Sequence, residues 1–292
     1  MVASARMSDT PEHFLAEHPE LLDEDRTSAL AQQVVAALTA PLSAYHRVSS
    51  SGWQHVPAGG CLVVANHNIH AVGEIFLLLR EWTRHLGARP ARGLMHRIAW
   101  QAPFKWFPLL QWIGGIFAHP EVARRALARR DALLVFPGGD VQALRPFRDR
   151  YRIDFYGRMG FVRLARDAGV PIVPVVICGA HATHIMLPGG EWLARKLGLK
   201  RSLGVRSFPL TVGAIGAAVG VAGGLLSPLL WPAAGLSLAS ATVALPSRID
   251  IEVLPPLLVA DGESDEAATA RVRDVMQASM DRLAARRRTP WF

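Results

Sequence analysis

Cysteine is nearly absent from this sequence. Its 292 residues include only Cys61 and Cys178, and each lies within an apolar run. Two isolated cysteines exclude a disulfide-stabilised scaffold, and we expect both thiols to be buried and reduced. Disordered and low-complexity compositions are excluded as well, because 50% of the residues are hydrophobic and 19% are charged. The length leaves room for one large domain or two small ones.

Lysine is almost as rare. Lys105, Lys196 and Lys200 are the only lysines among 32 basic residues, so arginine carries nearly all of the positive charge behind the net charge of +8. Guanidinium groups suit phosphate and carboxylate partners. The same surplus also arises where arginine serves only as a solvated cation, so charge alone identifies no partner.

The sequence also lacks several targeting and catalytic signatures. Its first residues, MVASARMSDTPEHF, contain no apolar core of a secretory signal, which predicts that the protein is not exported by that route and starts in the cytosol. No G-x-S-x-G turn, G-x-x-x-x-G-K-[ST] loop, H-E-x-x-H helix or C-x-x-C pair occurs. Their absence disfavours the usual serine hydrolases, P-loop enzymes, zincins and redox proteins. No stretch interleaves aromatic residues with a basic face, so we expect no nucleic-acid partner.

Short apolar runs alternate with helical patterns along most of the chain. Strands are expected at 61–66, 93–96, 132–137, 170–179 and 248–257, and helices at 74–82, 121–130, 160–169 and 263–288. The repeated order of strand, helix and strand favours a mainly parallel sheet that is covered on both faces. The predicted fold class is therefore α/β, with a mainly parallel central sheet flanked by helices.

Residues 1–43 are predicted to form a polar leader and an amphipathic helix ahead of a domain that spans 44–292. The leader, about residues 1–25, is acidic and is expected to be mobile or weakly helical. Apolar side chains recur at helical spacing over 28–42. This spacing fits a helix that packs on the domain or rests on a membrane surface.

Residues 207–247 carry no charged side chain, and Arg206 and Arg248 bracket them. A membrane-spanning helix needs about 20 apolar residues, so the segment is long enough for two helices. Pro228 and Pro232 divide it near its middle. We therefore expect an apolar helical hairpin, inserted in the domain, that enters or dips into a membrane. The alternative is a buried helical pair in the core.

Polar residues follow the strand expected at 61–66. Asn66 and His67 stand at its end, and His70 and Glu74 follow where a helix is expected to begin. An imidazole at this place can act as a general base near neutral pH, with a carboxylate to fix its tautomer. His67, His70 and Glu74 would also share one helical face and could hold a zinc ion. A third interpretation is that the two histidines only cap a helix.

A second polar segment, VFPGGDVQALRPFRDRYR, runs from Val135 to Arg152. Its glycines allow a ligand to approach the backbone closely. Its four arginines could bind the phosphate groups of a lipid or a nucleotide. Such runs are usually solvated loops, so this segment alone is a weak indication of a site.

In this order, the segments resemble the glycerolipid acyltransferase superfamily, which includes lysophosphatidate acyltransferases and mono- and diacylglycerol acyltransferase-like proteins. The resemblance extends from about Ala44 to the C-terminus and is carried by Asn66-His67, Phe107-Pro108 through Ile116, Phe136-Pro137-Gly138-Gly139-Asp140 and Val170-Pro171-Ile172-Val173-Pro174-Val175. The sequence departs from the family pattern in two places. Val72 stands where an aspartate commonly follows the histidine by five residues, and Gly138 stands where a glutamate is usual. In this respect the segment resembles the neutral-lipid branch of the superfamily, in which glycine replaces the glutamate.

The resemblance implies a role for each matching residue. His67 would be the general base, and Glu74, in place of the missing aspartate, would stabilise the imidazolium. The substrate-binding residues implied are Asn66, His70, Phe136, Pro137, Gly138, Gly139, Asp140, Arg145 and Arg158. No metal and no cofactor is expected.

The implied activity is transfer of a fatty acyl group to a hydroxyl of a glycerolipid, either a lysophospholipid or a mono- or diacylglycerol. The donor would be acyl-CoA or acyl-carrier-protein, as a co-substrate. Membrane lipids are the expected partners, which predicts a membrane-associated protein at the cytoplasmic face of the cell membrane. Two alternatives remain. One is a metal-dependent lipid hydrolase that uses His67, His70 and Glu74, and the other is a non-catalytic protein that binds lipid or acyl-CoA.

Overall fold

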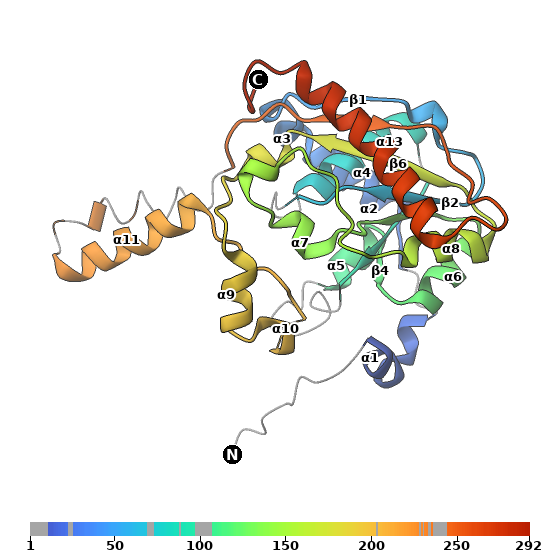
Figure 1. The fold of residues 1–292 in the computed structure, drawn as a ribbon, viewed down its shortest axis with the longest axis horizontal. Helices are drawn as coiled ribbons and strands as arrows, with labels where there is room; N and C mark the ends of the chain where they lie inside the picture. Colours follow the sequence, from blue (N-terminus) through green and yellow to red (C-terminus); the bar gives the residue numbers. More distant parts are fainter. Residues whose placement is uncertain are drawn as a thin grey trace.

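The computed structural model describes residues 11–22, 26–68, 73–87, 89–96, 107–202, 204–227, 229, 231, 232, 235 and 244–292. Over these residues, seven strands form one sheet with helices on both of its faces (Figure 1). The strands are β1 Ser49–Ser51, β2 Cys61–Ala65, β3 Ala91–Met95, β4 Gly115–Phe117, β5 Ala132–Val135, β6 Ile172–Cys178 and β7 Asp250–Val253. Their order across the sheet is β1-β7-β6-β2-β5-β3-β4.

The sheet is mainly parallel. All strands from β6 to β4 run in one direction, whereas β7 pairs antiparallel with β6, and β1 lies parallel to β7 at the edge. β2 is central, so Val63 lies beside Leu134 of β5 and Val173 of β6. The carboxyl ends of the parallel strands therefore meet at one edge of the sheet, where open α/β sheets place their ligands. The predicted α/β class with a mainly parallel sheet is confirmed.

Helices bury the two apolar faces of this sheet. They are α1 Pro11–Glu17, α2 Ala29–Leu38, α3 Ala40–Tyr45, α4 Gly73–Leu86, α5 Phe107–Trp112, α6 Pro120–Ala128, α7 Gly139–Ala143, α8 Gly160–Ala168, α9 Gly190–Lys196, α10 Leu199–Ser202, α11 Val212–Leu226 and α13 Asp265–Ala285. In β2, Leu62 and Val64 pack against α6, α8 and α13, and Val63 and Ala65 pack toward α4 on the other face. Because both faces are covered, this strand is a continuous apolar run without alternation.

The two cysteines lie in the central strands, Cys61 at the start of β2 and Cys178 at the end of β6. Both are buried and form no disulfide. Burial raises the pKa of each thiol to about 11, so neither is a ready nucleophile at neutral pH. The expectation of buried thiols is confirmed.

The N-terminal segment packs against the domain. Phe14 and Leu15 of α1 and Leu21 of the 3₁₀ turn Pro19–Leu22 are buried in the cluster that α6 and α8 also enter. The helix expected over 28–42 is formed by α2 and α3. Gln32 joins α2 to the sheet, because its Nε2 donates to the carbonyls of Ala91 and Ile113 at 2.7 and 2.9 Å. A domain boundary near residue 43 stays a prediction.

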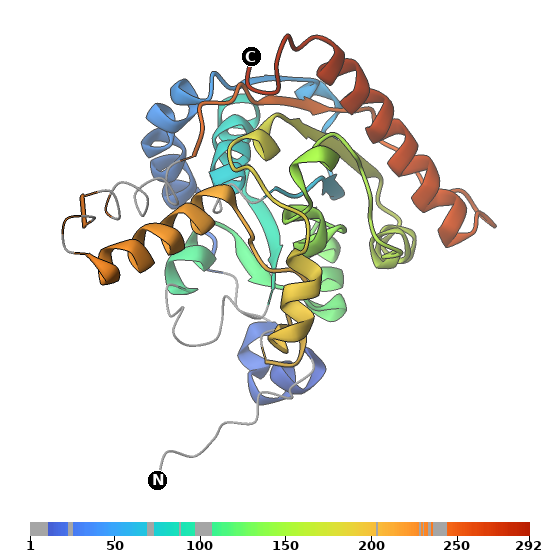
Figure 2. The same cartoon turned by 60° about the vertical axis from the view of Figure 1, so that its left-hand side comes forward.

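Between β6 and β7 the chain makes a long excursion from the sheet. It contains α9, α10 and α11, and α11 projects away from the sheet in both views (Figures 1 and 2). α11 lies where the first arm of the hairpin is expected, and most of the second arm lies outside the described residues. Its 15 residues give a length of about 22 Å, against about 30 Å for the hydrocarbon core of a bilayer. In the described part of the chain, no helix is both long and apolar enough to span a membrane.

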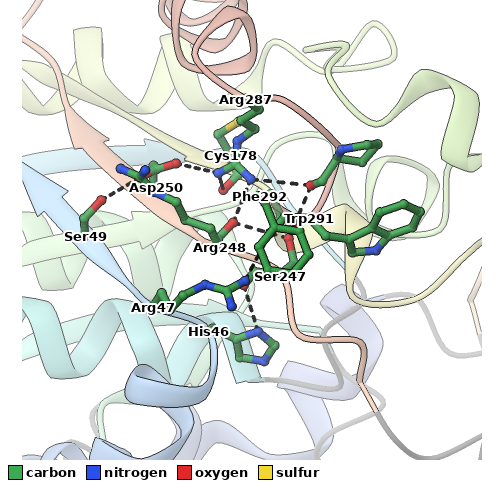
Figure 3. A network of polar contacts seen from close by, with 12 residues as sticks. His46, Arg47, Ser49, Cys178, Ser247, Arg248, Asp250, Arg287, Trp291 and Phe292 are labelled. Carbon is green, nitrogen blue, oxygen red and sulfur yellow. Dashed lines mark hydrogen bonds and ion pairs between the residues drawn. The ribbon is translucent and has the colours of Figure 1, made fainter.

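A polar network fixes the point at which this excursion returns to the sheet (Figure 3). Arg287, which follows α13, forms an ion pair with Asp250 and donates to the carbonyls of Arg248 and Cys178 at 2.8 and 3.2 Å. Asp250 also accepts from Ser49 Oγ at 2.5 Å and from Arg248 Nε at 2.9 Å. The network thus joins the edge strand β1, the ends of β6 and β7, and the C-terminal helix.

The last residues of the chain extend the network. Arg47 donates to the carbonyls of Pro246 and Trp291, at 3.1 and 3.2 Å, and its guanidinium lies 4.5 Å from the centre of the Phe292 ring. The buried ring of His46 is bonded through Nδ1 to the carbonyl of Ser247 at 3.1 Å, and burial lowers the pKa of this imidazole. His46 is therefore neutral near pH 7.

Replacement of Arg287 should strongly destabilise the fold. The side chain of Arg287 is 3% exposed and that of Asp250 is 11% exposed. Arg287→Ala therefore leaves a largely buried carboxylate whose charge is balanced only by its contacts with Ser49 and Arg248. We expect the free energy of unfolding to fall by about 3–5 kcal/mol. The matched control is Arg273→Ala, which breaks the exposed pair with Asp274 and should cost about 1 kcal/mol or less. Urea unfolding followed by circular dichroism measures both. Equal losses in the two variants would contradict the role assigned to the network.

Candidate active site

The centre of the candidate site lies just beyond the carboxyl end of β2. Asn66, the first residue after this strand, is fully buried and bonds to the backbone of Ile177 in β6. Its Oδ1 accepts from the Ile177 amide at 2.7 Å, and its Nδ2 donates to the Ile177 carbonyl at 2.9 Å. Asn66 therefore continues the pairing of β2 with β6 by one residue. His67 follows at the point where the two strands can no longer pair.

His67 forms a pair with Glu74 of α4. The side chain of Glu74 is 1% exposed, and its Oε1 accepts from Nδ1 of His67 and from the backbone amide of Asn68, the latter at 3.1 Å. Glu74 stands in the first turn of α4, where the helix dipole also favours a negative charge. Since Nδ1 donates its hydrogen to the carboxylate, the neutral ring carries its proton on Nδ1, and Nε2 is the basic nitrogen. Nε2 has no hydrogen-bond partner among the described residues.

The turn after β5 brings further predicted residues to His67. The ring of Phe136 stacks on the imidazole, with ring centres 4.6 Å apart. Gly139 has a positive φ of 53°, and a Cβ there would lie 2.0 Å from Nη1 of Arg158. Arg158 donates to the carbonyl of Pro137 at 3.1 Å and to Asp140 at 3.4 Å. Gly139 is therefore favoured by its backbone conformation, whereas the guanidinium of Arg158, at the end of a flexible side chain, could move away from a Cβ.

A cleft of about 850 Å³ opens beside this turn. The predicted residues that line it are His67, Phe136, Pro137, Gly139, Asp140 and Arg158. Most of the other lining side chains are apolar, and the cleft also holds the cations Arg124 and Arg163. A cleft of this size with an apolar wall and a few charged groups is typical of a site for a small organic ligand.

Other predicted residues lie elsewhere. Glu74, Asn66, Gly138 and Arg145 do not line the cleft, and His70 lies outside the described residues. Arg145 is 3% exposed and donates to the carbonyl of Arg150 at 2.9 Å and to Nδ1 of His181 at 3.2 Å. The structure therefore does not bring Arg145 to the cleft, and a role for it in substrate binding stays a prediction.

Burial governs the charges of Arg145 and His181. It lowers the pKa of Arg145 to about 10, so the guanidinium remains charged at neutral pH. Burial, together with the charge of Arg145, holds the pKa of His181 well below its usual range. The neutral ring accepts from Arg145 through Nδ1, and Nε2 donates to the carbonyl of Gln142 at 3.0 Å.

The structure adds residues that the sequence analysis missed. His96 and His119 line the cleft and follow β3 and β4, just as His67 follows β2. The rule that parallel strands end at one edge could have found both. Arg124 and Arg163 come from α6 and α8. The paired contacts of Gln142, described below, had no local signal in the sequence.

The described residues contain no group of three or more His, Cys, Asp or Glu side chains placed to hold a metal ion. Glu74 Oε1 is engaged by His67 Nδ1 and the Asn68 amide, which is the arrangement of an acid–base pair. The zinc interpretation includes His70, which lies outside the described residues, so it stays a prediction.

Comparisons with known proteins bear on the family and the fold of this chain. Residues 47–178 match the family model described as Acyltransferase. Uncharacterized proteins of Mycobacterium leprae and Mycobacterium tuberculosis are each 31% identical to the chain in an alignment of 258 positions that covers 85% of the chain. The chain spans 63% and 64% of the length of these two relatives.

A solved structure shares the fold. The 1-acyl-sn-glycerophosphate (LPA) acyltransferase PlsC from Thermotoga maritima matches 87% of this chain and 81% of its own, with a TM-score of 0.52 and 16% sequence identity. The range matched by the family model contains His67, Glu74 and the turn 136–140. The motifs and the family model therefore agree that residues 47–178 carry an acyltransferase domain, and the chain shares the α/β fold of PlsC.

Proposed function

We propose that this protein transfers a fatty acyl group from a thioester, acyl-CoA or acyl-carrier-protein, to a hydroxyl of a glycerolipid. The observation that carries the proposal is the pair formed by His67, which lines the cleft, and the buried carboxylate of Glu74 behind it. One nitrogen of the imidazole is held by a buried carboxylate, and the other is available as a base. This is the arrangement that activates a hydroxyl group in acyl transfer.

The reaction needs one proton acceptor and no covalent acyl-enzyme. Nε2 of His67 takes the proton of the acceptor hydroxyl while that oxygen attacks the thioester carbonyl. The tetrahedral intermediate then expels the thiolate, which takes the proton from the imidazolium. Glu74 stabilises the imidazolium between these two steps, because its charge lies against Nδ1 throughout.

The lining of the cleft suits amphipathic substrates. Leu94, Val135 and Phe161 offer apolar surface to an acyl chain or a pantetheine arm, and Arg124, Arg158 and Arg163 offer cations to phosphate groups. These phosphates are present in coenzyme A, in the carrier-protein prosthetic group and in lysophospholipids. Gly138 supplies no carboxylate, in keeping with the neutral-lipid branch, so mono- and diacylglycerol are acceptors to test beside lysophospholipids.

Membrane association is part of the proposal, with α11 as the contact. The helix carries no charged side chain, and Val219, Leu225 and Leu226 are exposed. At the base of the excursion, α9 exposes Trp192 beside Lys196, and Lys200 of α10 is also exposed, which suits an interface with anionic headgroups. Since α11 is too short to span a bilayer, we place its apolar surface within one leaflet.

Two alternatives differ in what they predict. A metal-dependent lipid hydrolase would release free fatty acid and lose that activity to a chelator. A non-catalytic member would bind acyl-CoA or lipid without turnover. The paired His67 and Glu74 favour acyl transfer over a non-catalytic member, which requires no base held in this way. A histidine held by a carboxylate can also bind zinc, so the response to a chelator separates acyl transfer from the hydrolase.

Replacement of His67 should abolish ester formation. His67→Ala removes the base, and we expect the turnover rate to fall by about 10²–10⁴-fold. The assay is mass spectrometry of the lipids formed from labelled oleoyl-CoA and a panel of lysophospholipids, monoacylglycerol and diacylglycerol. His13→Ala, an exposed histidine on α1, is the matched control and should retain full activity.

The same assay separates the alternatives. Ester formation by His67→Ala at the wild-type rate would rule out His67 as the base. Release of labelled oleate that stops with a chelator would favour the hydrolase, and bound oleoyl-CoA without any product would favour the non-catalytic member.

Charge on α11 should release the protein from membranes. In Leu225→Asp/Leu226→Asp, two exposed leucines become carboxylates, and burial of each leucine is worth about 1.5–3 kcal/mol. We expect co-sedimentation with vesicles of phosphatidylcholine and phosphatidylglycerol to weaken by at least about tenfold. Leu258→Asp changes a leucine of similar exposure after β7, outside α2 and α11, and should leave binding unchanged. If the α11 variant and this control bind vesicles alike, α11 is not the membrane contact.

A further inference from the structure

Gln142 is a buried residue that contacts the backbone of His67. It lies on α7 and is fully buried. Its Oε1 accepts from the backbone amide of His67 at 2.8 Å, and its Nε2 donates to the carbonyl of Asp154 at 3.0 Å. Both ends of the carboxamide are therefore used, and one of them holds the residue that we assign as the base.

The His67 amide has no partner within the sheet, because the pairing of β2 ends at Ala65 with β6 and at Val64 with β5. Gln142 supplies the missing acceptor from the turn after β5. With this contact, His67 is held at its backbone by Gln142, at Nδ1 by Glu74 and at its ring face by Phe136. The carboxamide thus determines where the chain that carries the imidazole lies, and Glu74 determines how the ring is turned.

Gly138 provides the space that Gln142 occupies. A Cβ at position 138 would lie 2.4 Å from Cβ and 2.5 Å from Oε1 of Gln142. The φ of Gly138 is −64°, an ordinary helical value that any residue adopts, so backbone conformation does not require glycine here. Space does, because the Cβ of Gln142 cannot move without a shift of α7. Gly138 and Gln142 are therefore a matched pair.

We propose that Gln142 is a positioning residue for acyl transfer, which sets the place of His67 through its backbone amide, and that glycine at position 138 is required to admit it. The proposal rests on the proposed function, since His67 is the base that Gln142 positions. It also gives the departure at Gly138 a physical role. The glycine leaves the turn without a carboxylate at this position. It also leaves space for Gln142, whose hydrogen bond holds the backbone of His67 in addition to the contact with Glu74.

Gln142→Met tests the proposal, because methionine fills a similar volume and makes neither hydrogen bond. We expect kcat to fall by about 10- to 100-fold, because a base that is displaced by up to about 1 Å loses activity on this scale. KM for both substrates should stay within about twofold, because Gln142 does not line the cleft. All assays use the full-length protein at a temperature where circular dichroism shows each variant to be folded.

The control is Gln32→Met. Gln32 is also buried and also bonds through its carboxamide to backbone groups, but at the opposite edge of the sheet, where β3 begins. Both variants should lower the melting temperature, and only Gln142→Met should lower kcat. An equal loss of kcat in Gln32→Met would show that the effect comes from general destabilisation, and would overturn the proposal.

Gly138→Ala provides an independent test that keeps the glutamine. Its Cβ displaces Gln142, so kcat should fall as in Gln142→Met. Because the two changes break the same contact, the double variant Gly138→Ala/Gln142→Met should lose little more than either single variant. Losses that multiply would overturn the coupling of the two residues.

The failures can be told apart. Wild-type kcat in folded Gln142→Met, with His67→Ala inactive, overturns the positioning role alone. Activity of His67→Ala at the wild-type rate overturns the proposed base and the positioning role together. If Gln142→Met does not fold, Gly138→Ala decides, and its wild-type kcat would overturn the proposal.

Discussion

The buried carboxylate of Glu74 is the group on which the candidate site depends. Removal of a carboxylate from water costs roughly several kcal/mol, and the cost must be offset by charges and hydrogen bonds nearby. His67 Nδ1 and the amide of Asn68 offset this cost at Oε1, and the N-terminus of α4 favours the charge, whereas Oε2 is buried and has no hydrogen-bond partner among the described residues. The buried guanidinium of Arg145 contributes as well, since the charge of Glu74 is among those that oppose the lowering of its pKa. The base and its carboxylate therefore stabilise one another in the fold before any substrate is present.

The sheet fixes the backbone position of His67. β2 is buried between two parallel neighbours, so its end has little freedom, and Asn66 extends its pairing to the last residue before His67. Gln142 then provides the acceptor that the sheet no longer offers. A loop would hold the imidazole less well, because the backbone amide that precedes the ring would be bonded to water. The end of a central strand is thus both exposed enough for chemistry and rigid enough for a base.

The sequence predicts those parts of the site that depend on local patterns. A buried strand that ends in polar residues predicts that His67 lies at the carboxyl edge of the sheet. The Pro-Gly-Gly turn predicts that Phe136 and Asp140 follow the end of another strand at that edge. Arg145 shows where local reasoning fails. In the sequence Arg145 belongs to an arginine-rich loop that would be expected to be exposed to solvent. The fold buries it beside His181, a residue 36 positions away. Gln142 could not be assigned either, because its partner is 75 residues distant and a glutamine on a short helix has no distinctive pattern.

Asp140 joins the site to the apolar excursion. Its Oδ1 is bonded to Arg158 at 3.4 Å, and its Oδ2 accepts from the backbone amides of Arg206 and Ser207. Gly204 and Val205, just before these amides, form part of the cleft wall. The chain therefore passes from the cleft to the base of α11 within a few residues, and one carboxylate fixes that path to the turn that supports His67. If α11 lies in a leaflet, this connection holds the mouth of the cleft close to the same surface. A lipid hydroxyl can then reach His67 without its acyl chains crossing water.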